Sequence, residues 1–241
     1  MTVLPKTALP EIYATIMREI KLRLDAIASA FYRAQEDQGA PTAPLDCEIC
    51  YLQLRRCSEL IALSALVAHN GIAEFRRKTL MKEWRAADLI KMLADLSNDA
   101  FPEPTVIGEL DENGDGDLFI ESLAGKNRSI LSAIYSGCSD KLHAGNLKRL
   151  LSSGGKNYDL EEIHEWRNFI VGLLNTHAIL LPDRRSVMIV FMARAPHGDV
   201  SCELADLEQV TGSKGVSHPN PPLSLRSKSW SHSGIRKPKS S

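Results

Sequence analysis

The charged residues within the stretch 44–69 are the first candidates for chemistry, because this stretch is otherwise apolar. Arg55, Arg56 and Glu59 interrupt it, and an unpaired charge is costly to bury. Arg55 and Glu59 are one helical turn apart, so they can form a structural ion pair. The alternative is a polar cleft lined by Arg56 and Glu59, which makes both of them candidate site residues.

His143 is the third candidate. It lies in CSDKLHAGN, residues 138–146, where a predicted helix ends beside small and polar residues. A histidine in this position can cap the helix by binding its last carbonyl groups. It can also act as an acid, a base or a contact to RNA, because an imidazole titrates near neutral pH.

The segment 111–122, DENGDGDLFIES, resembles the calcium-binding loop of an EF-hand. Its oxygen-bearing side chains at positions one, three, five and seven are Asp111, Asn113, Asp115 and Asp117. The twelfth position, however, holds Ser122 where a glutamate would bind calcium with both oxygens. We therefore expect a solvated acidic turn with no calcium affinity tighter than roughly millimolar.

Cys47, Cys50 and Cys57 are of a residue type that serves metal and redox chemistry. On a helix, Cys50 and Cys57 are about 10 Å apart, too far for one zinc ion at ~2.3 Å from each sulfur. Cys47 and Cys50 alone could bind a metal or form a redox pair, but no second CxxC motif or nearby histidine completes the set. The pattern favours buried free thiols.

Signatures of the common enzyme classes are missing from the sequence. There is no GxxxxGK[ST], no GxGxxG after a strand, no GxSxG and no HExxH. This lowers the expectation of an enzyme. The sequence indicates no cofactor and no metal.

A helix at 44–69 is the element that must position most of these side chains. Its apolar residues recur at spacings of three and four, Pro44 suits the first turn, and Asn70 and Gly71 supply a stop. From 60 to 68 the helix is apolar on nearly every face, which is typical of a helix surrounded by other elements. The sequence therefore predicts that the core includes Leu60, Ile61 and Leu63.

The remaining elements are predicted to be mostly helical. A helix at 10–36 has one apolar stripe and should form an antiparallel hairpin with the helix at 44–69. Further helices are predicted at 78–97, 126–142, 146–152 and 159–177.

Strand patterns occur in two places. Residues 186–195 favour a strand, and a glycine-containing turn leads to a second strand at 199–205. Because an isolated hairpin is marginal, we expect this one to lie on the helices or to pair with another edge. Residues 105–122 have a weaker hairpin pattern. The predicted fold class is mainly α: a helical bundle built on a long helical hairpin, with a small C-terminal β-hairpin.

The 241 residues are 44% hydrophobic and 24% charged, which is typical of one globular domain with an appendage. We place the domain at 1–211. The net charge of −1 conceals an asymmetry, because six basic residues and no acidic one follow Glu208. Residues 212–241 are rich in Ser and Pro, and we expect a disordered basic tail that is dispensable for folding. It is either a solubilising extension or a contact to nucleic acid or acidic lipid.

The start of the chain lacks the charged segment and apolar run of a signal peptide, and the number of cysteines, five, is odd. These features predict a cytoplasmic protein with reduced thiols. The longest apolar stretch is interrupted by charges, so we expect no membrane span.

The long hairpin, the shorter helices after it and the helix-ending LHAGN are similar in architecture, over residues 10–180, to the bacterial helical-bundle proteins called HEPN-like. The resemblance implies dimerisation and a place in toxin–antitoxin or antiphage systems. Active HEPN ribonucleases carry an Arg followed four to six residues later by a His. Within residues 10–180 no Arg meets that spacing: after Arg167, the next His is His177.

Two functions follow as hypotheses. The first is a non-catalytic helical interaction protein, dimeric, whose partner is another protein or a second copy. The alternative is a HEPN-like RNA-binding protein or ribonuclease that uses Arg56, Glu59 and His143. A cleft that gathers these three side chains would favour the second, and separate surfaces would favour the first.

Overall fold

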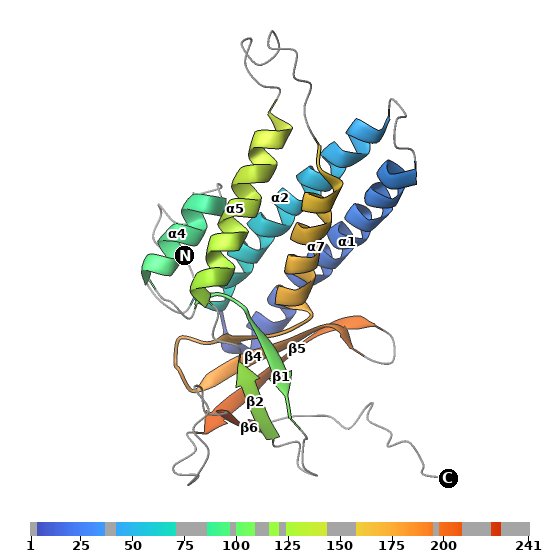
Figure 1. Cartoon of the computed structure of the whole chain (residues 1–241). Helices are drawn as coiled ribbons and strands as arrows, with labels where there is room; N and C mark the ends of the chain where they lie inside the picture. Colours follow the sequence, from blue (N-terminus) through green and yellow to red (C-terminus); the bar gives the residue numbers. More distant parts are fainter. Residues whose placement is uncertain are drawn as a thin grey trace, which may run out of the picture.

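The structure is a computed structural model of the chain. It describes residues 4–36, 42–70, 86–96, 100–108, 116–120, 124–143, 158–194, 198–208 and 223–227. Two parts are visible: a layer of helices and, beneath it, a ring of strands (Figure 1).

The helices follow the predicted positions closely. Their bounds are α1 Leu9–Glu36, α2 Ala43–Ala68, α4 Ala86–Leu96, α5 Ala124–Leu142 and α7 Leu160–Leu174, and a short 3-10 helix, Lys6–Ala8, precedes α1. The predicted helix at 146–152 and the first part of the one at 78–97 lie outside the described residues.

The α1–α2 hairpin forms as predicted. Arg33 near the end of α1 pairs with Asp46 near the start of α2 at 2.6 Å, and Arg23 donates to Gln53 at 2.7 Å, so the two helices run antiparallel. Between them lies the main core, which includes the fully buried side chains of Met17, Ile20, Ile27, Leu54 and Ile61. Apolar positions three and four apart on both helices produce this shared face.

One expectation for α2 is wrong. Ile61 is buried as predicted and Leu60 is partly buried, but 42% of Leu63 is exposed. The reason is that α2 is apolar on two opposite faces while only one of them packs against α1. α2 therefore contacts α1, α4, α5 and α7 and still leaves one apolar face exposed.

α5 and α7 complete the helical layer. Asp159 caps α7 by accepting from the backbone N–H groups of Glu161 and Glu162, at 2.9 and 3.2 Å. α7 packs against α5 where the Trp166 ring lies over Gly137, so closely that a Cβ on Gly137 would meet the ring at 2.5 Å. A larger residue at position 137 would therefore force the Trp166 ring to move.

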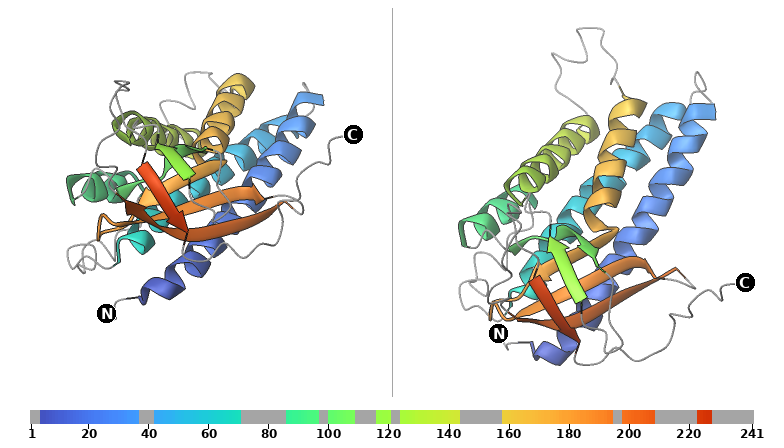
Figure 2. Two further views of the ribbon diagram at one scale, coloured as in Figure 1. Left: turned by 90° about the horizontal axis from the view of Figure 1, so that it is seen from below. Right: turned by 60° about the horizontal axis from the view of Figure 1, so that its bottom comes forward.

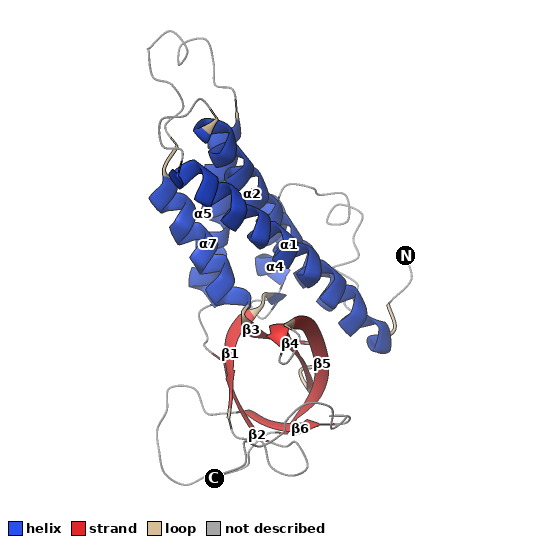
Figure 3. Ribbon diagram, turned by 90° about the vertical axis from the view of Figure 1, so that its right-hand side faces the viewer, coloured by secondary structure: helices blue, strands red, loops and turns tan. Residues whose placement is uncertain are grey.

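The strands form a closed antiparallel barrel in the order β1-β2-β6-β5-β4-β3 (Figure 3). Their bounds are β1 Glu103–Ile107, β2 Gly116–Ile120, β3 Thr176–Leu180, β4 Ser186–Arg194, β5 Asp199–Glu208 and β6 Leu223–Ser227. The predicted hairpin of β4 and β5 is present, and so is the weaker hairpin of β1 and β2. The fold class needs correction, because the C-terminal hairpin is part of a six-stranded barrel.

Two strands lie where the sequence predicted something else. β3 begins at Thr176, within the helix predicted at 159–177, because α7 already ends at Leu174. β6 lies within the predicted disordered tail and pairs with both β2 and β5. The rest of residues 212–241 lies outside the described residues.

The two faces of the barrel wall differ in what they contact. Alternate residues of the strands form an interior cluster that includes Ala178, Val187, Ile189 and Ala205. The residues between them, such as Met188, Val190 and Met192, join the core beneath the helices. This alternation is the two-residue period of a strand with both faces covered.

α1 and α7 both join the helical layer to the barrel: α1 runs along the strands β4 and β5 (Figure 2), and α7 contacts β1, β3 and β4. The ammonium group of Lys21 donates to the backbone carbonyls of Met192, at 3.2 Å, and Gly198. Below it, Lys6 pairs with Asp183 at 2.9 Å. In the described part of the chain, no helix is both long and apolar enough to cross a membrane.

Candidate functional site

The predicted ion pair on α2 is present. The guanidinium of Arg55 lies 3.2 Å from a carboxylate oxygen of Glu59, and Arg56 lies 2.7 Å from the other oxygen. Arg55 also lies over the ring of Tyr135 on α5, at 5.2 Å from its centroid. Arg55 is thus a packing residue between two helices, whereas Arg56 is mostly exposed and faces away from them.

His143 is not brought together with Arg56 and Glu59. It is exposed just after the end of α5, and its backbone N–H donates to the Ser139 carbonyl at 3.1 Å. Tyr135 is level with Arg55, and α5 continues for eight residues, or about 12 Å, to His143 in the direction away from Glu59. His143 therefore lies on a different surface from the Arg56–Glu59 pair.

The calcium-like segment is only partly visible. Asp111, Asn113 and Asp115 lie outside the described residues. Asp117 is in strand β2, where it is the pairing partner of Ser224 in β6. Asp117 is thus part of a paired strand and not of a loop, which differs from the seventh position of an EF-hand loop.

The cysteines of α2 are buried free thiols, as predicted. Burial raises the pKa of each, to about 12 for Cys50 and Cys57. A thiol with such a high pKa is not ionised near neutral pH and is a poor nucleophile. Packing explains these side chains without chemistry.

A buried polar contact joins the helices to the barrel. The Nδ1 of His177 in β3 lies 2.8 Å from the Leu174 carbonyl and its Nε2 lies 3.1 Å from the Tyr13 hydroxyl. Since a carbonyl only accepts, Nδ1 carries the proton and Tyr13 donates to Nε2. Burial lowers the pKa of His177 to about 4, against the effect of its bond to Leu174. The residue is thus a neutral structural histidine.

The exposed face of α2 carries a row of four apolar side chains and one arginine. We call the row the outer stripe, and its members are Leu45, Ile49, Leu52, Arg56 and Leu63. Their spacings of four, three, four and seven residues follow a heptad pattern. The exposed fraction is 59% for Leu45 and 42% for both Leu52 and Leu63. An exposed apolar row on one helix face is typical of a surface that contacts another protein.

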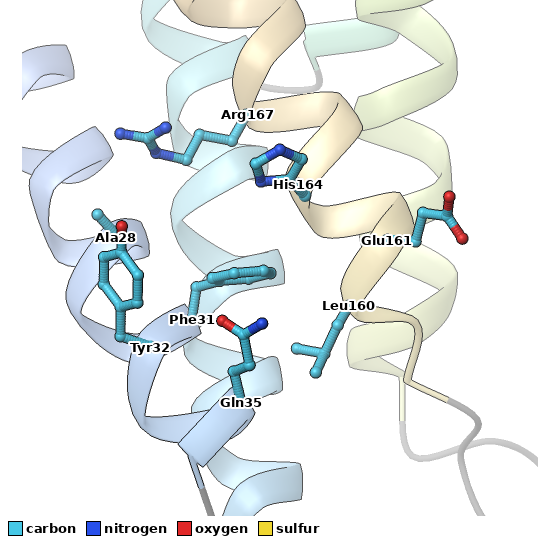
Figure 4. Close-up of a pocket in the computed structure, with 8 residues that line it drawn as sticks. All are labelled: Ala28, Phe31, Tyr32, Gln35, Leu160, Glu161, His164 and Arg167. Carbon is cyan, nitrogen blue, oxygen red and sulfur yellow. The ribbon is translucent and has the colours of Figure 1, made fainter. Parts of the chain in front are cut away.

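A groove between α1 and α7 is the second feature that could bind something. It has a volume of about 460 Å³ and is lined by Ala28, Phe31, Tyr32, Gln35, Leu160, Glu161, His164 and Arg167 (Figure 4). A volume of this size lies within the range of ligand sites. The sequence analysis did not select these residues as a site.

Both features have a signal in the sequence. The outer stripe could be found in the sequence as a second row of heptad-spaced residues on α2, opposite the row that forms the core face. The α1 residues of the groove lie at spacings of three and four, but nothing in the sequence indicates that they face α7. Comparison of the chain with protein-family models, with curated proteins and with solved structures finds no match.

Proposed function

We propose that the protein is a non-catalytic interaction protein that self-associates through the outer stripe of α2. The observation that supports this function is the row of exposed apolar side chains in heptad spacing. Such a row is costly to leave in water and is stabilised when a matching row covers it. A second copy supplies a matching row because it presents the same residues.

The charges on α2 favour one orientation of the second copy. In an antiparallel arrangement around a twofold axis, Arg56 of each copy lies opposite Glu59 of the other. In the same register, Leu52 of one copy lies opposite Leu63 of the other, on both sides of the axis. A parallel arrangement would place Arg56 against Arg56, which is repulsive. The outer stripe is therefore complementary to itself when antiparallel.

The size of the stripe sets the strength of the dimer. In the antiparallel register the part of the stripe that faces itself, from Leu52 to Leu63, is about 17 Å long. One helix face of this length offers a few hundred Å², which is less than the roughly 800 Å² per partner of a stable interface. We expect a dimer with a Kd of roughly micromolar order, so its population changes with protein concentration.

Sedimentation velocity over a range of concentrations tests the dimer. Leu52→Glu places a charge in the middle of the stripe and should abolish the dimer at every concentration reached. Leu22→Glu is the matched control, since Leu22 is 70% exposed on α1, outside the stripe. A monomeric parent protein, or a dimer that survives Leu52→Glu, contradicts the proposal.

A charge exchange tests the orientation. The double variant Arg56→Glu with Glu59→Arg reverses the pair between positions 56 and 59 but removes the carboxylate partner of Arg55, and it should still dimerise with itself. Mixed with the parent protein, it would place like charges opposite each other, so mixed dimers should be rare. Native mass spectrometry after mixing measures their fraction. Abundant mixed dimers would show that the antiparallel arrangement is incorrect.

The HEPN-like alternative shares dimerisation with this proposal but also needs a site for RNA. Of its three candidates, Arg56 and Glu59 form an ion pair but His143 lies on a different surface, and this separation favours a non-catalytic protein. Cleavage of a labelled RNA pool that is lost in the His143→Ala variant would favour the ribonuclease instead.

A further inference from the structure

The groove between α1 and α7 combines an apolar floor with a cationic group. Phe31 and Leu160 supply apolar surface, and the Phe31 and His164 rings lie against each other with centroids 5.7 Å apart. Tyr32 stands at the edge, 62% exposed, with its ring edge-on to Phe31. This part of the groove suits a flat, largely apolar molecule.

Arg167 supplies the charge. Its side chain points from α7 toward α1, as does that of His164 (Figure 4). The side chain is partly buried, its Nε is buried without a hydrogen-bond acceptor, and no carboxylate of the described residues pairs with it. Partial burial of an unpaired charge is unfavourable, and an anion in the groove would relieve it.

The other polar groups determine which anion fits. Glu161, the only acidic residue of the lining, points away from α1 (Figure 4), so it does not oppose an anion in the groove. The amide nitrogen of Asn168 lies 2.8 Å from Nε2 of His164, which holds the imidazole in place. Among the described residues of the lining, Arg167 is the side chain with a permanent positive charge, which matches one negative charge on the ligand.

We propose that this groove binds a small planar molecule that carries one carboxylate, with the ring against Phe31 and the carboxylate on Arg167. A guanidinium matches a carboxylate in shape and charge. The hydroxyl of Tyr32 and the amide of Gln35 are further donors in the lining. The site is on α1 and α7 and is separate from the outer stripe, so it goes beyond the proposed function.

The probes 2-naphthoate and 2-naphthamide test the proposal, because they share a ring and size and differ in charge. Titration into the full chain, followed by nitrogen–proton NMR that includes the arginine Nε–H signals, measures both affinities. We expect a Kd below roughly 1 mM for the carboxylate and at least tenfold weaker binding of the amide. Equal binding of the two probes, or binding of neither, overturns the proposal.

Variants assign the effect to the arginine. Arg167→Gln should weaken naphthoate binding at least tenfold, and Arg167→Lys should weaken it less because the charge remains. Arg33→Gln is the control. Arg33 is on α1, the other helix of the groove, but it pairs with Asp46 outside the groove, so this variant should leave binding unchanged. If Arg167→Gln binds as the parent protein does, the proposal fails.

One further probe separates a small molecule from a protein terminus. An N-acetylated tripeptide that ends in a free phenylalanine carboxylate presents the same chemistry on a peptide. We expect it to bind more weakly than naphthoate, because a tripeptide is longer than naphthoate and is not planar, so it fits a groove of this volume less well. Tighter binding of the peptide would overturn the assignment to a small molecule.

Discussion

The two opposite faces of α2 are both apolar, yet only one of them is buried. The core face, with Leu54, Cys57 and Ile61, packs against α1 and is fully buried, whereas the outer stripe stays exposed. Apolar composition therefore shows that a face avoids water but not what covers it. For the core face the cover is within the chain, and for the outer stripe we propose a second copy.

The largest expected effect is on the core face. Ile61→Ala removes a fully buried side chain and leaves a cavity, so the free energy of unfolding should fall by about 2–5 kcal/mol. Urea denaturation measures the change. A loss of less than about 1 kcal/mol would mean that the two faces of α2 do not differ as described.

The next effect is the pH dependence of stability, which comes from the buried contact between His177 and Tyr13. Because burial lowers the pKa of His177 from its usual value of 6.5 to about 4, the unfolded chain binds a proton in this range that the folded chain does not. The contribution of His177 to the free energy of unfolding should therefore be fully present above about pH 6.5. It should be lost as the pH decreases toward 4, which lowers the free energy of unfolding by at most roughly 3 kcal/mol. Denaturation at several pH values measures this slope, and His177→Gln should reduce it.

The third effect is the contribution of β6, which completes the barrel beneath the helices, to the stability of the protein. Truncation after Glu208 removes β6 and leaves β2 and β5 each without one of their pairing partners. We expect Tm to fall by about 5 °C or more. Truncation after Lys228 keeps β6 and should change Tm little. An equal Tm for both truncated chains would restore the original expectation that residues 212–241 are dispensable.

The smallest effect is on the outer stripe. Leu63→Ala shortens a side chain that is 42% exposed, so the stability of the monomer should change by less than about 1 kcal/mol. The same variant should weaken the dimer, since Leu63 lies opposite Leu52 in the proposed arrangement. Urea denaturation and sedimentation velocity measure the two effects separately. A loss as large as that of Ile61→Ala would show that Leu63 is a core residue after all.

The helices, the α1–α2 hairpin and the β4–β5 hairpin could be predicted because their sequence signals are local. Spacing of apolar residues, Pro44 at the start of α2 and alternation in 186–195 each depend on neighbours in the sequence. β6 could not be predicted in the same way. Its five residues are flanked by Ser, Pro and Lys, and it is a strand only because β2 and β5 pair with it.

The candidate sites show the same limit. The pairing of Arg55 with Glu59 follows from helical spacing and was predictable. The separation of His143 from Glu59 depends on the direction in which α5 crosses α2, which spacing within each helix does not determine. The groove was missed because Phe31 and Arg167 lie on helices far apart in the sequence.

Closure of the barrel has a consequence for the order in which the protein folds. Leu118 in β2 pairs with Leu223 in β6, 105 positions later, so one edge of β2 has no partner until residue 223 has been made. At about 5–20 residues per second, synthesis of that interval lasts roughly 5–20 s. The helices and the β1–β2 hairpin have local contacts and can form earlier, while ring closure is slow because its contacts are distant. During that interval, the open edge of β2 is a place where a nascent chain is exposed to pairing with other chains.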